Sequence, residues 1–128
     1  MQSRSMGANL GIEFTEIGED YLVARMPVDK RTIQPMGLLH GGASATLAET
    51  LGSVASVLLQ DDITKSPIVG IEINANHLGS ARSGFVTGKV TPIKIGRTIH
   101  VWNIDIVDEN DQKICVSRLT TMVLNKEK

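Results

Sequence analysis

The run from Gln34 to Leu59 constrains the fold more than any other stretch, because it begins as a turn and continues as the only long helix that the sequence offers. Its first part holds residues that fix or free the backbone angle φ where a chain changes direction. These are Pro35, Gly37, Gly41 and Gly42. From Ala43 to Leu59 there is no Pro, Glu49 is the one charged residue, and Ala and Leu are strong helix formers. The sequence therefore predicts a tight turn followed by one long helix.

Projected at about 100° per residue, this helix has a hydrophobic face and a face of small residues. The hydrophobic face holds Ala43, Leu47, Leu51, Val54, Ala55 and Leu58. The opposite face holds Gly42, Ala45, Thr46, Glu49, Gly52, Ser53 and Ser56. A face exposed to solvent usually carries several Lys, Arg and acidic residues. We therefore expect a ligand or another subunit to approach the small-residue face closely.

Glu49 stands on this face, about 10 Å along the helix from Gly42 at 1.5 Å per residue. Small neighbours and an approaching partner would leave its carboxylate with few competing waters, which suits a general base or a nucleophile. The alternative is an ordinary exposed helix residue, and for a lone Glu the residue types leave both interpretations open.

The start of the helix supplies a second candidate group. Backbone N–H groups of the first turn, near Gly41 and Gly42, have no partner inside the helix and lie at the positive end of its dipole. Such a site can hold a carbonyl oxygen as it becomes an oxyanion, and His40 and Gln34 are further donors beside it. A tight helix entry with a capping histidine is the alternative, and the presence of Glu49 on the same helix favours the site.

Composition excludes several classes of function. The chain has 128 residues, 41% hydrophobic residues and a net charge of −1, as a single globular domain does. A pI near 6.3 and 3% aromatic residues argue against nucleic-acid binding. Cys115 is the only cysteine, which indicates a reducing compartment, and the three histidines are too scattered for a metal site. Without a signal peptide or an unbroken apolar span, the expected location is the cytoplasm and no membrane is involved.

Alternating hydrophobic residues predict six strands, at residues 10–17, 21–28, 68–77, 84–95, 98–107 and 113–124. In the third, Val69, Ile71, Ile73 and Ala75 alternate with polar residues, and Gly70 predicts a bulge or a close backbone approach. The fifth places His100, Trp102, Ile104 and Ile106 on one face. The polar tail at 125–128 is predicted to be disordered.

One helix among six strands predicts an α+β domain in which an antiparallel sheet of five to six strands wraps around the helix. The small-residue face then remains for a partner, so we expect a homo-oligomer.

Three motifs together resemble the hotdog-fold acyl-CoA thioesterases. They are the segment from Gln34 through His40-Gly-Gly to Glu49, the segment 70–77, and Ser117-Arg-Leu-Thr-Thr. Within that family the similarity is to the 1,4-dihydroxy-2-naphthoyl-CoA thioesterases of menaquinone synthesis and the proofreading thioesterases of enterobactin synthesis. It runs from about residue 11 to 124, so residues 1–128 are expected to form a single hotdog domain.

The resemblance implies hydrolysis of an acyl-CoA or aryl-CoA thioester, with no cofactor and no metal, at an active site between subunits of a dimer of dimers. Glu49 would attack the thioester carbonyl or activate water. The Gly41 N–H would polarise the carbonyl with help from His40 and Gln34, and Ser53 would hold water or Glu49. The substrate-binding positions that it implies are Gly70, His77, Leu78, Gly79, Ser80, Arg82, Lys94, Ile95, Gly96, Arg97 and Thr98.

Lys94 and Arg97 are the expected partners of the CoA phosphates, followed by Arg82. In two places the chain departs from its relatives. Leu78-Gly79 is apolar where they often carry a basic residue, and the N-terminus is short and is expected to lack their leading helix.

Three other functions use the same fold. The first is a module that binds acyl-CoA or an acyl carrier without hydrolysis, and the second is a proofreading thioesterase that acts on an acyl carrier protein. The third is a hotdog dehydratase, against which the position of Glu49 after His40-Gly-Gly argues.

Overall fold

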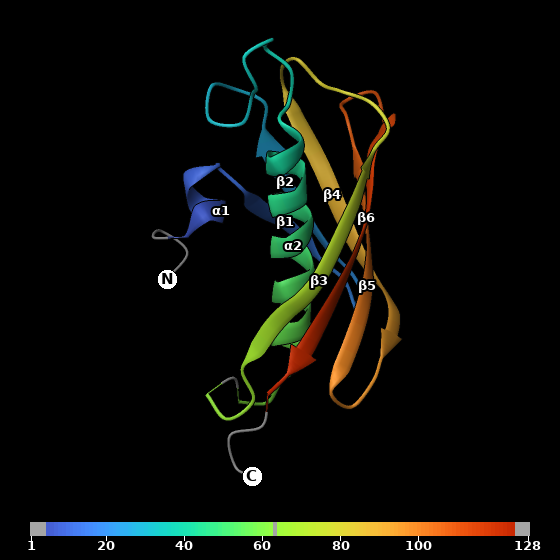
Figure 1. Cartoon of the computed structure of the whole chain (residues 1–128). Coiled ribbons are helices and arrows are strands. Elements are labelled where there is room, and N and C mark those ends of the chain that lie inside the picture. Colours follow the sequence, from blue (N-terminus) through green and yellow to red (C-terminus); the bar gives the residue numbers. More distant parts are fainter. Residues whose placement is uncertain (1–4, 63, 125–128) are drawn as a thin grey trace.

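The computed structural model describes residues 5–62 and 64–124, so the tail predicted at 125–128 lies outside the described residues. The elements are α1 (Met6–Asn9), β1 (Glu13–Ile17), β2 (Leu22–Pro27), α2 (Gly41–Leu58), β3 (Ile68–His77), β4 (Phe85–Ile95), β5 (Ile99–Val107) and β6 (Lys113–Val123). The six strands form one antiparallel sheet in the order β1-β2-β4-β5-β6-β3. Figure 1 shows α2 lying along the inner side of this curved sheet, which confirms the predicted hotdog arrangement.

The core lies between α2 and the inner face of the sheet. Leu47 and Leu51 of α2 are fully buried, and burial of such a side chain contributes about 1.5–3 kcal/mol. On β5 every second residue from His100 to Ile106 is buried, as the alternation predicted. No helix among residues 5–62 and 64–124 is both long enough and apolar enough to span a membrane.

The sheet covers a wider arc of α2 than the helical projection predicted. Gly52 and Ser56, expected on the open face, are both buried. A Cβ on Gly52 would lie 2.4 Å from a methyl carbon of Leu119 in β6, so a glycine allows the sheet to approach the helix here. Leu58, expected on the buried face, is 57% exposed and lines a cavity beside the β1–β2 turn. The open face is therefore narrower than predicted.

β3 contains the bulge that Gly70 predicted, since its register with β6 shifts between Gly70 and Glu72. The shift breaks the simple alternation along the strand. Ile73 and Ala75 pack against the core, whereas Val69 and Ile71 are 38% and 51% exposed, contrary to the expectation that all four share one face. β3 is also an edge strand, because β6 is the only strand beside it in the sheet.

The first strand begins at Glu13 rather than at residue 10, because α1 precedes it. Ser5 caps α1 by accepting a hydrogen bond from the Ala8 N–H at 3.1 Å, and Gly11 turns the chain with φ +78°. Gly7 is buried and faces Thr50 of α2. A leading helix of one turn is thus present, and the expectation that it is absent was wrong.

Candidate active site

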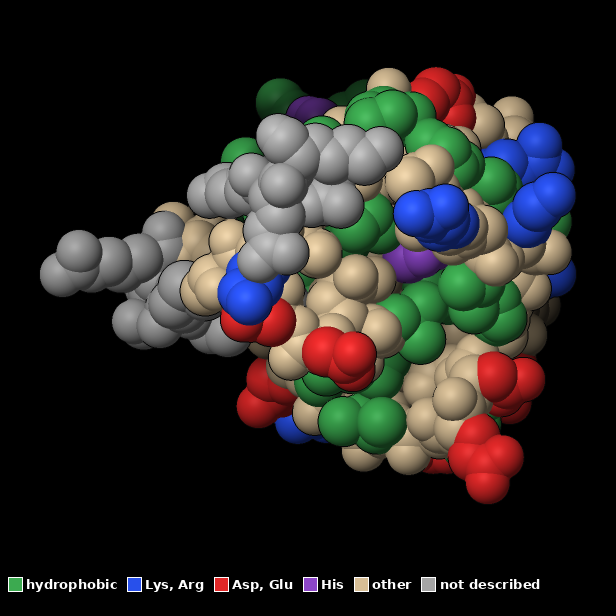
Figure 2. All heavy atoms as spheres, turned by 90° about the horizontal axis from the view of Figure 1, so that it is seen from below, with side chains coloured by type: hydrophobic (Ala, Val, Ile, Leu, Met, Phe, Trp, Pro, Cys, Tyr) green, Lys and Arg blue, Asp and Glu red, His purple; other side chains and the backbone are tan. Residues whose placement is uncertain are grey.

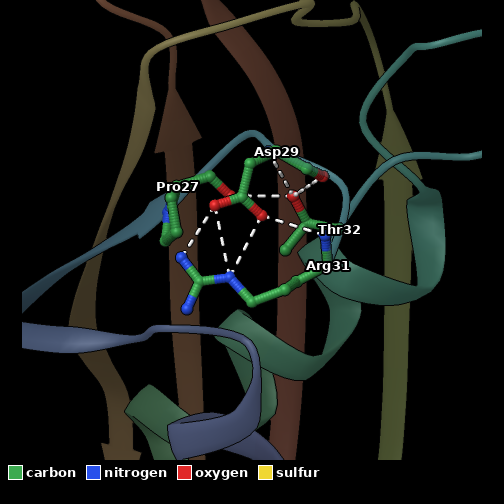
Figure 3. Close-up of polar contacts among 4 residues, drawn as sticks. All are labelled: Pro27, Asp29, Arg31 and Thr32. Carbon is green, nitrogen blue, oxygen red and sulfur yellow. Dashed lines mark hydrogen bonds and ion pairs between the residues drawn. The ribbon is translucent and has the colours of Figure 1, made fainter.

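The loop between β2 and α2 holds His40 in place through a set of local hydrogen bonds. The buried Thr32 hydroxyl donates to the Pro27 carbonyl at 2.8 Å and accepts from the Asp29 N–H at 3.1 Å (Figure 3). Arg31 pairs with the Asp29 carboxylate at 2.7 Å, and its side-chain hydrogen bonds lower the pKa of that carboxyl group. The Thr32 carbonyl in turn accepts from the His40 N–H at 2.7 Å. The entrance to α2 is therefore fixed to the end of β2.

The Gln34 side chain closes its own turn. Its Oε1 accepts from the Met36 N–H at 2.5 Å and the Leu38 N–H at 3.4 Å, and Gly37 supplies the positive φ of +82°. The Gln34 Nε2 makes no hydrogen bond within residues 5–62 and 64–124. The amide nitrogen therefore remains a donor, as predicted, while the amide oxygen has a structural role that the sequence did not reveal.

His40 is the N-cap of α2. Its Nδ1 accepts the Gly42 N–H at 2.7 Å, so in the neutral ring the proton is on Nε2, which becomes an outward donor. The Gly42 N–H is consequently occupied, which corrects the view that both glycines offer free donors. The Gly41 N–H has no acceptor in the part of the chain that is described, and it is the donor left at the positive end of the helix.

The His77 ring of β3 lies directly beside Gly41. A Cβ on Gly41 would stand 3.0 Å from the His77 Nε2, so a larger residue at position 41 would require the ring to shift. The sequence placed His77 on the nucleotide side of the substrate, and it did not predict this contact with the helix terminus.

Glu49 lies midway along α2 and is exposed in the protomer, so the predicted poor hydration is not seen in the single chain. Its Oε2 lies 3.2 Å from the position of a Cβ on Gly70, which is the close approach predicted at that glycine. Ser53 lies one turn further along α2 and is half-buried. Glu49 therefore lies beside Gly70, and it shares the lining of one cavity with Ser53.

A cavity of about 340 Å³ opens beside Glu49 between α1 and α2. Its lining is Ser5, Met6, Gly7, Thr46, Glu49, Thr50, Ser53 and Val54. The α1 residues were not predicted from the sequence, although Ser5 before a short helical segment is an N-cap signal that indicates where α1 begins.

A larger cavity of about 380 Å³ lies at the other end of the helix, between the β1–β2 turn, Leu58 and Trp102. Glu49 is not among its lining residues, so the larger cavity is not the one beside the candidate acid.

The residues predicted to bind the nucleotide divide into two groups at opposite ends of the molecule. His77 ends β3 and Leu78, Gly79, Ser80 and Arg82 follow it, at the end where α2 begins. Lys94, Ile95, Gly96, Arg97 and Thr98 form the β4–β5 turn, at the end where α2 finishes (Figure 1). The nine residue steps of β4 from Phe85 to Lys94 separate them by about 30 Å at the usual rise of a strand. One protomer therefore does not bring the two groups together.

No group of three His, Cys, Asp or Glu residues suited to a metal ion occurs among the described residues.

The comparisons with known proteins agree with this geometry. The sequence pattern of the Thioesterase superfamily matches residues 36–115, which include the helix entrance and Glu49. The chain belongs to this superfamily.

Its relatives carry thioesterase names. A 1,4-dihydroxy-2-naphthoyl-CoA hydrolase of Escherichia coli is 52% identical over 97% of this chain and 90% of the relative. A proofreading thioesterase of Cronobacter turicensis is 51% identical over 91% of this chain and 83% of the relative. The crystal structure of a Haemophilus influenzae thioesterase superposes with a TM-score of 0.93 at 52% identity, covering 98% of this chain and 87% of that one. The protein is therefore a hotdog-fold thioester hydrolase.

Proposed function

We propose that this thioesterase hydrolyses acyl-CoA or aryl-CoA thioesters to the free acid and CoA, with Glu49 as the nucleophile or general base. The observation that carries the proposal is the placement of two groups along β3. The Glu49 carboxylate lies against Gly70 near one end of the strand, and Gly41, whose N–H is free in the described part of the chain, lies beside the His77 ring at the other. An acid and an oxyanion donor are the two groups that thioester hydrolysis requires.

The two groups of one protomer are too far apart to act on one carbonyl. Gly41 and Glu49 are eight residues apart in α2, which is about 12 Å along the helix axis. The donor nitrogen lies about 3 Å from the carbonyl oxygen, and the attacking oxygen approaches the carbonyl carbon to about 3 Å. The donor nitrogen and the attacking oxygen must therefore lie within about 7 Å of each other. The site is therefore complete only when a second copy supplies one of the two groups.

The free edge of β3 suggests how the second copy is placed. A ten-residue edge strand exposes a row of N–H and C=O groups that pair readily with another strand. Antiparallel pairing of two β3 edges about an axis near Ile73 and Asn74 sets Gly70 of one copy near His77 of the other. Glu49 of one copy then faces the Gly41 N–H of the second, and the two copies form two equivalent sites.

The same pairing brings together the two groups of residues that are predicted to bind the nucleotide. Because the copies run in opposite directions, the β4–β5 turn of one lies at the same end of the dimer as residues 77–82 of the other. Lys94 and Arg97 of that turn are exposed cations suited to the phosphates of CoA. We propose that two such dimers form a tetramer and that the enzyme works in the cytoplasm, in keeping with its single buried Cys115.

In the reaction, the thioester oxygen accepts the Gly41 N–H at the positive end of α2, where the negative charge of the tetrahedral intermediate is stabilised. The His40 Nε2–H and the Gln34 amide are further donors. Glu49 either attacks the carbonyl carbon, giving an anhydride that water opens, or removes a proton from the attacking water while Ser53 orients it. In both routes the C–S bond breaks, the CoA thiolate leaves and takes up a proton, and the acid is released.

The test is the substitution Glu49→Gln, assayed by trapping the released CoA thiol. We expect a loss of about 10²- to 10⁴-fold in turnover, as for removal of a positioned base, with the fold unchanged. Glu19→Gln, at an exposed position in the β1–β2 turn, is the matched control and should retain full activity. Retention of most of the turnover by Glu49→Gln would refute the role of this acid. Thermal stabilisation by CoA esters without thiol release would favour the non-catalytic binding module.

The identity of the substrate's acyl group is a separate question. We propose an aryl group such as 1,4-dihydroxy-2-naphthoyl, in line with the name of the Escherichia coli relative, and the proofreading relative makes an aroyl carrier protein the second candidate. Comparing kcat/KM for an aroyl-CoA, a fatty acyl-CoA and an aroyl carrier protein distinguishes the two. A preference for fatty acyl-CoA would contradict both.

A further inference from the structure

Four polar side chains are buried together beneath the end of α2 that lies farthest from Gly41. The Ser56 Oγ lies 2.9 Å from the His100 Nδ1 and 2.7 Å from the Thr121 Oγ1, and it accepts the Trp102 Nε1–H at 2.7 Å. All four residues are at most 3% exposed. We refer to Ser56, His100, Trp102 and Thr121 as the buried quartet. It joins the last turns of α2 to β5 and β6.

The hydrogen bonds of the quartet converge on the Ser56 hydroxyl. The Trp102 N–H can only donate, and the Ser56 hydroxyl has one proton and two acceptor positions. Ser56 therefore accepts from Trp102 and from one of its other two partners, Thr121 or His100, and donates its own proton to the remaining one. A neutral His100 ring fits both arrangements, with Nδ1 as the acceptor in one and as the donor in the other. Burial lowers the pKa of His100, with a smaller opposing effect from the Gly96 backbone.

The quartet lies next to the β4–β5 turn, residues 94–98, in the strand pairing. His100 is the second residue of β5 and stands opposite Ile95 of β4 and Thr121 of β6. The turn itself is closed by the Gly96 N–H donating to the Ile99 carbonyl and by the Val123 N–H donating to the Thr98 carbonyl, both at 2.8 Å. Figure 2 views this end of the molecule, where Lys and Arg side chains stand beside a group of hydrophobic side chains.

The turn has little other support from the interior. The register of β4 shifts between Pro92 and Lys94, and Ile95 is 51% exposed rather than packed inside. Lys94 and Arg97 are exposed and form no ion pair with the described part of the chain. His100 is therefore the first fully buried side chain after the turn, and its ring also packs edge-on against Trp102 with centroids 6.0 Å apart.

We propose that His100, held by Ser56 and Thr121, is a positioning residue that sets the conformation of the β4–β5 turn and so aligns Lys94 and Arg97 with the phosphates of CoA. This rests on the proposed function, in which the turn contacts the nucleotide. His100 touches no substrate, and it acts through the backbone that it anchors.

The experiment compares two thioesters that carry the same acyl group, one of CoA and one of pantetheine, which lacks the phosphorylated nucleotide. His100→Leu removes the hydrogen-bond partner of the Ser56 hydroxyl, whereas His100→Asn keeps one, because its side-chain amide can take the place of Nδ1 as acceptor or donor. We expect His100→Leu to raise KM for the CoA thioester about tenfold, the effect of one lost hydrogen bond to a charged group. The KM for the pantetheine thioester should change less than about twofold, kcat should be unchanged for both, and His100→Asn should restore much of the affinity for the CoA thioester.

A loss shared equally by both thioesters would show that His100 supports the fold in general, and no change in either would show that it does not hold the turn. If His100→Leu fails to fold, Thr121→Val decides in the same way, because it keeps the side-chain shape and loses the hydroxyl, with Thr121→Ser as its control.

Arg97→Ala separates this inference from the proposed function. If Arg97→Ala weakens the CoA thioester selectively and the quartet variants do not, only the positioning role is wrong. If Arg97→Ala shows no selectivity, the assignment of the turn to the nucleotide is wrong as well.

Discussion

The Glu49 carboxylate lies against Gly70, with its Oε2 3.2 Å from the position where a Cβ would stand. The pair joins the middle of α2 to the bulge in edge strand β3, and a side chain at position 70 would occupy space beside the acid. The position of the carboxylate therefore depends on the absence of a side chain at position 70.

Gly70→Ala is expected to displace the acid without disturbing the fold. The added methyl group meets the end of a flexible side chain, so the free energy of unfolding should change by less than about 0.5 kcal/mol. A misplacement of about 1 Å can cost up to about 10²-fold in rate, so kcat should fall by about ten- to a hundredfold. Thermal unfolding and the thiol-trapping assay measure the two effects. Wild-type kcat in a normally folded Gly70→Ala would mean that the contact has no part in the reaction.

Gly52→Ala tests the opposite case, in which the methyl group meets the packed core. Its Cβ would lie 2.4 Å from a Leu119 methyl carbon, and Leu119 is only 1% exposed. Overpacking of this kind costs about 1–3 kcal/mol, which urea unfolding will detect. Ala45→Ser, on the partly exposed face of the same helix, is the control and should change stability by less than about 0.5 kcal/mol. Equal stability of Gly52→Ala and the wild type would contradict the close packing of α2 on β6.

His40 has two separable roles, because one ring nitrogen caps α2 and the other remains a donor. In His40→Asn the Oδ1 still accepts the Gly42 N–H, so stability should be retained, whereas His40→Ala should lose about 0.5–2 kcal/mol with the cap. Both variants lack the Nε2–H. If this donor serves the oxyanion, both should lose activity, by up to about 10²- to 10³-fold. A stable and fully active His40→Asn would limit His40 to the capping role.

Much of the fold follows from local pattern. The period of two in the strands and the long Ala-rich stretch gave the six strands and α2 in the correct order, because each reflects which side faces the core, whereas the short α1 was not predicted. The helical projection failed at Gly52 and Ser56, since the width of the buried face depends on how far the sheet curls. It failed at Leu58 because that side chain lines an open cavity instead of packing into the core, which a helical wheel does not predict.

In the candidate site, too, the features within one segment could be predicted and the contacts between distant segments could not. Glu49, Gly41 and His40 could be predicted from one continuous segment, in which residue type and spacing carry the chemistry. The contacts of Gly41 with His77 and of Glu49 with Gly70 join segments far apart in the sequence, and only the sheet order brings them together. The buried quartet was not predicted either, because Ser56 looked like part of a small-residue face and His100 like one member of a hydrophobic alternation.

Stability should fall in mildly acidic solution because of His100. Its pKa in the folded protein is lowered below the ordinary value of 6.5, chiefly by burial, so the unfolded chain binds a proton more readily than the folded one. The stability that neutral His100 contributes is fully present above pH 6.5 and is lost as the pH falls through the folded-state pKa. The pKa values of Asp29 and Asp62 are lowered from 3.8, so their contributions change only at more acidic pH. Urea unfolding between pH 7.5 and 5 should therefore show a decline that is absent or smaller in His100→Asn, and an equal decline in both proteins would assign the effect to other groups.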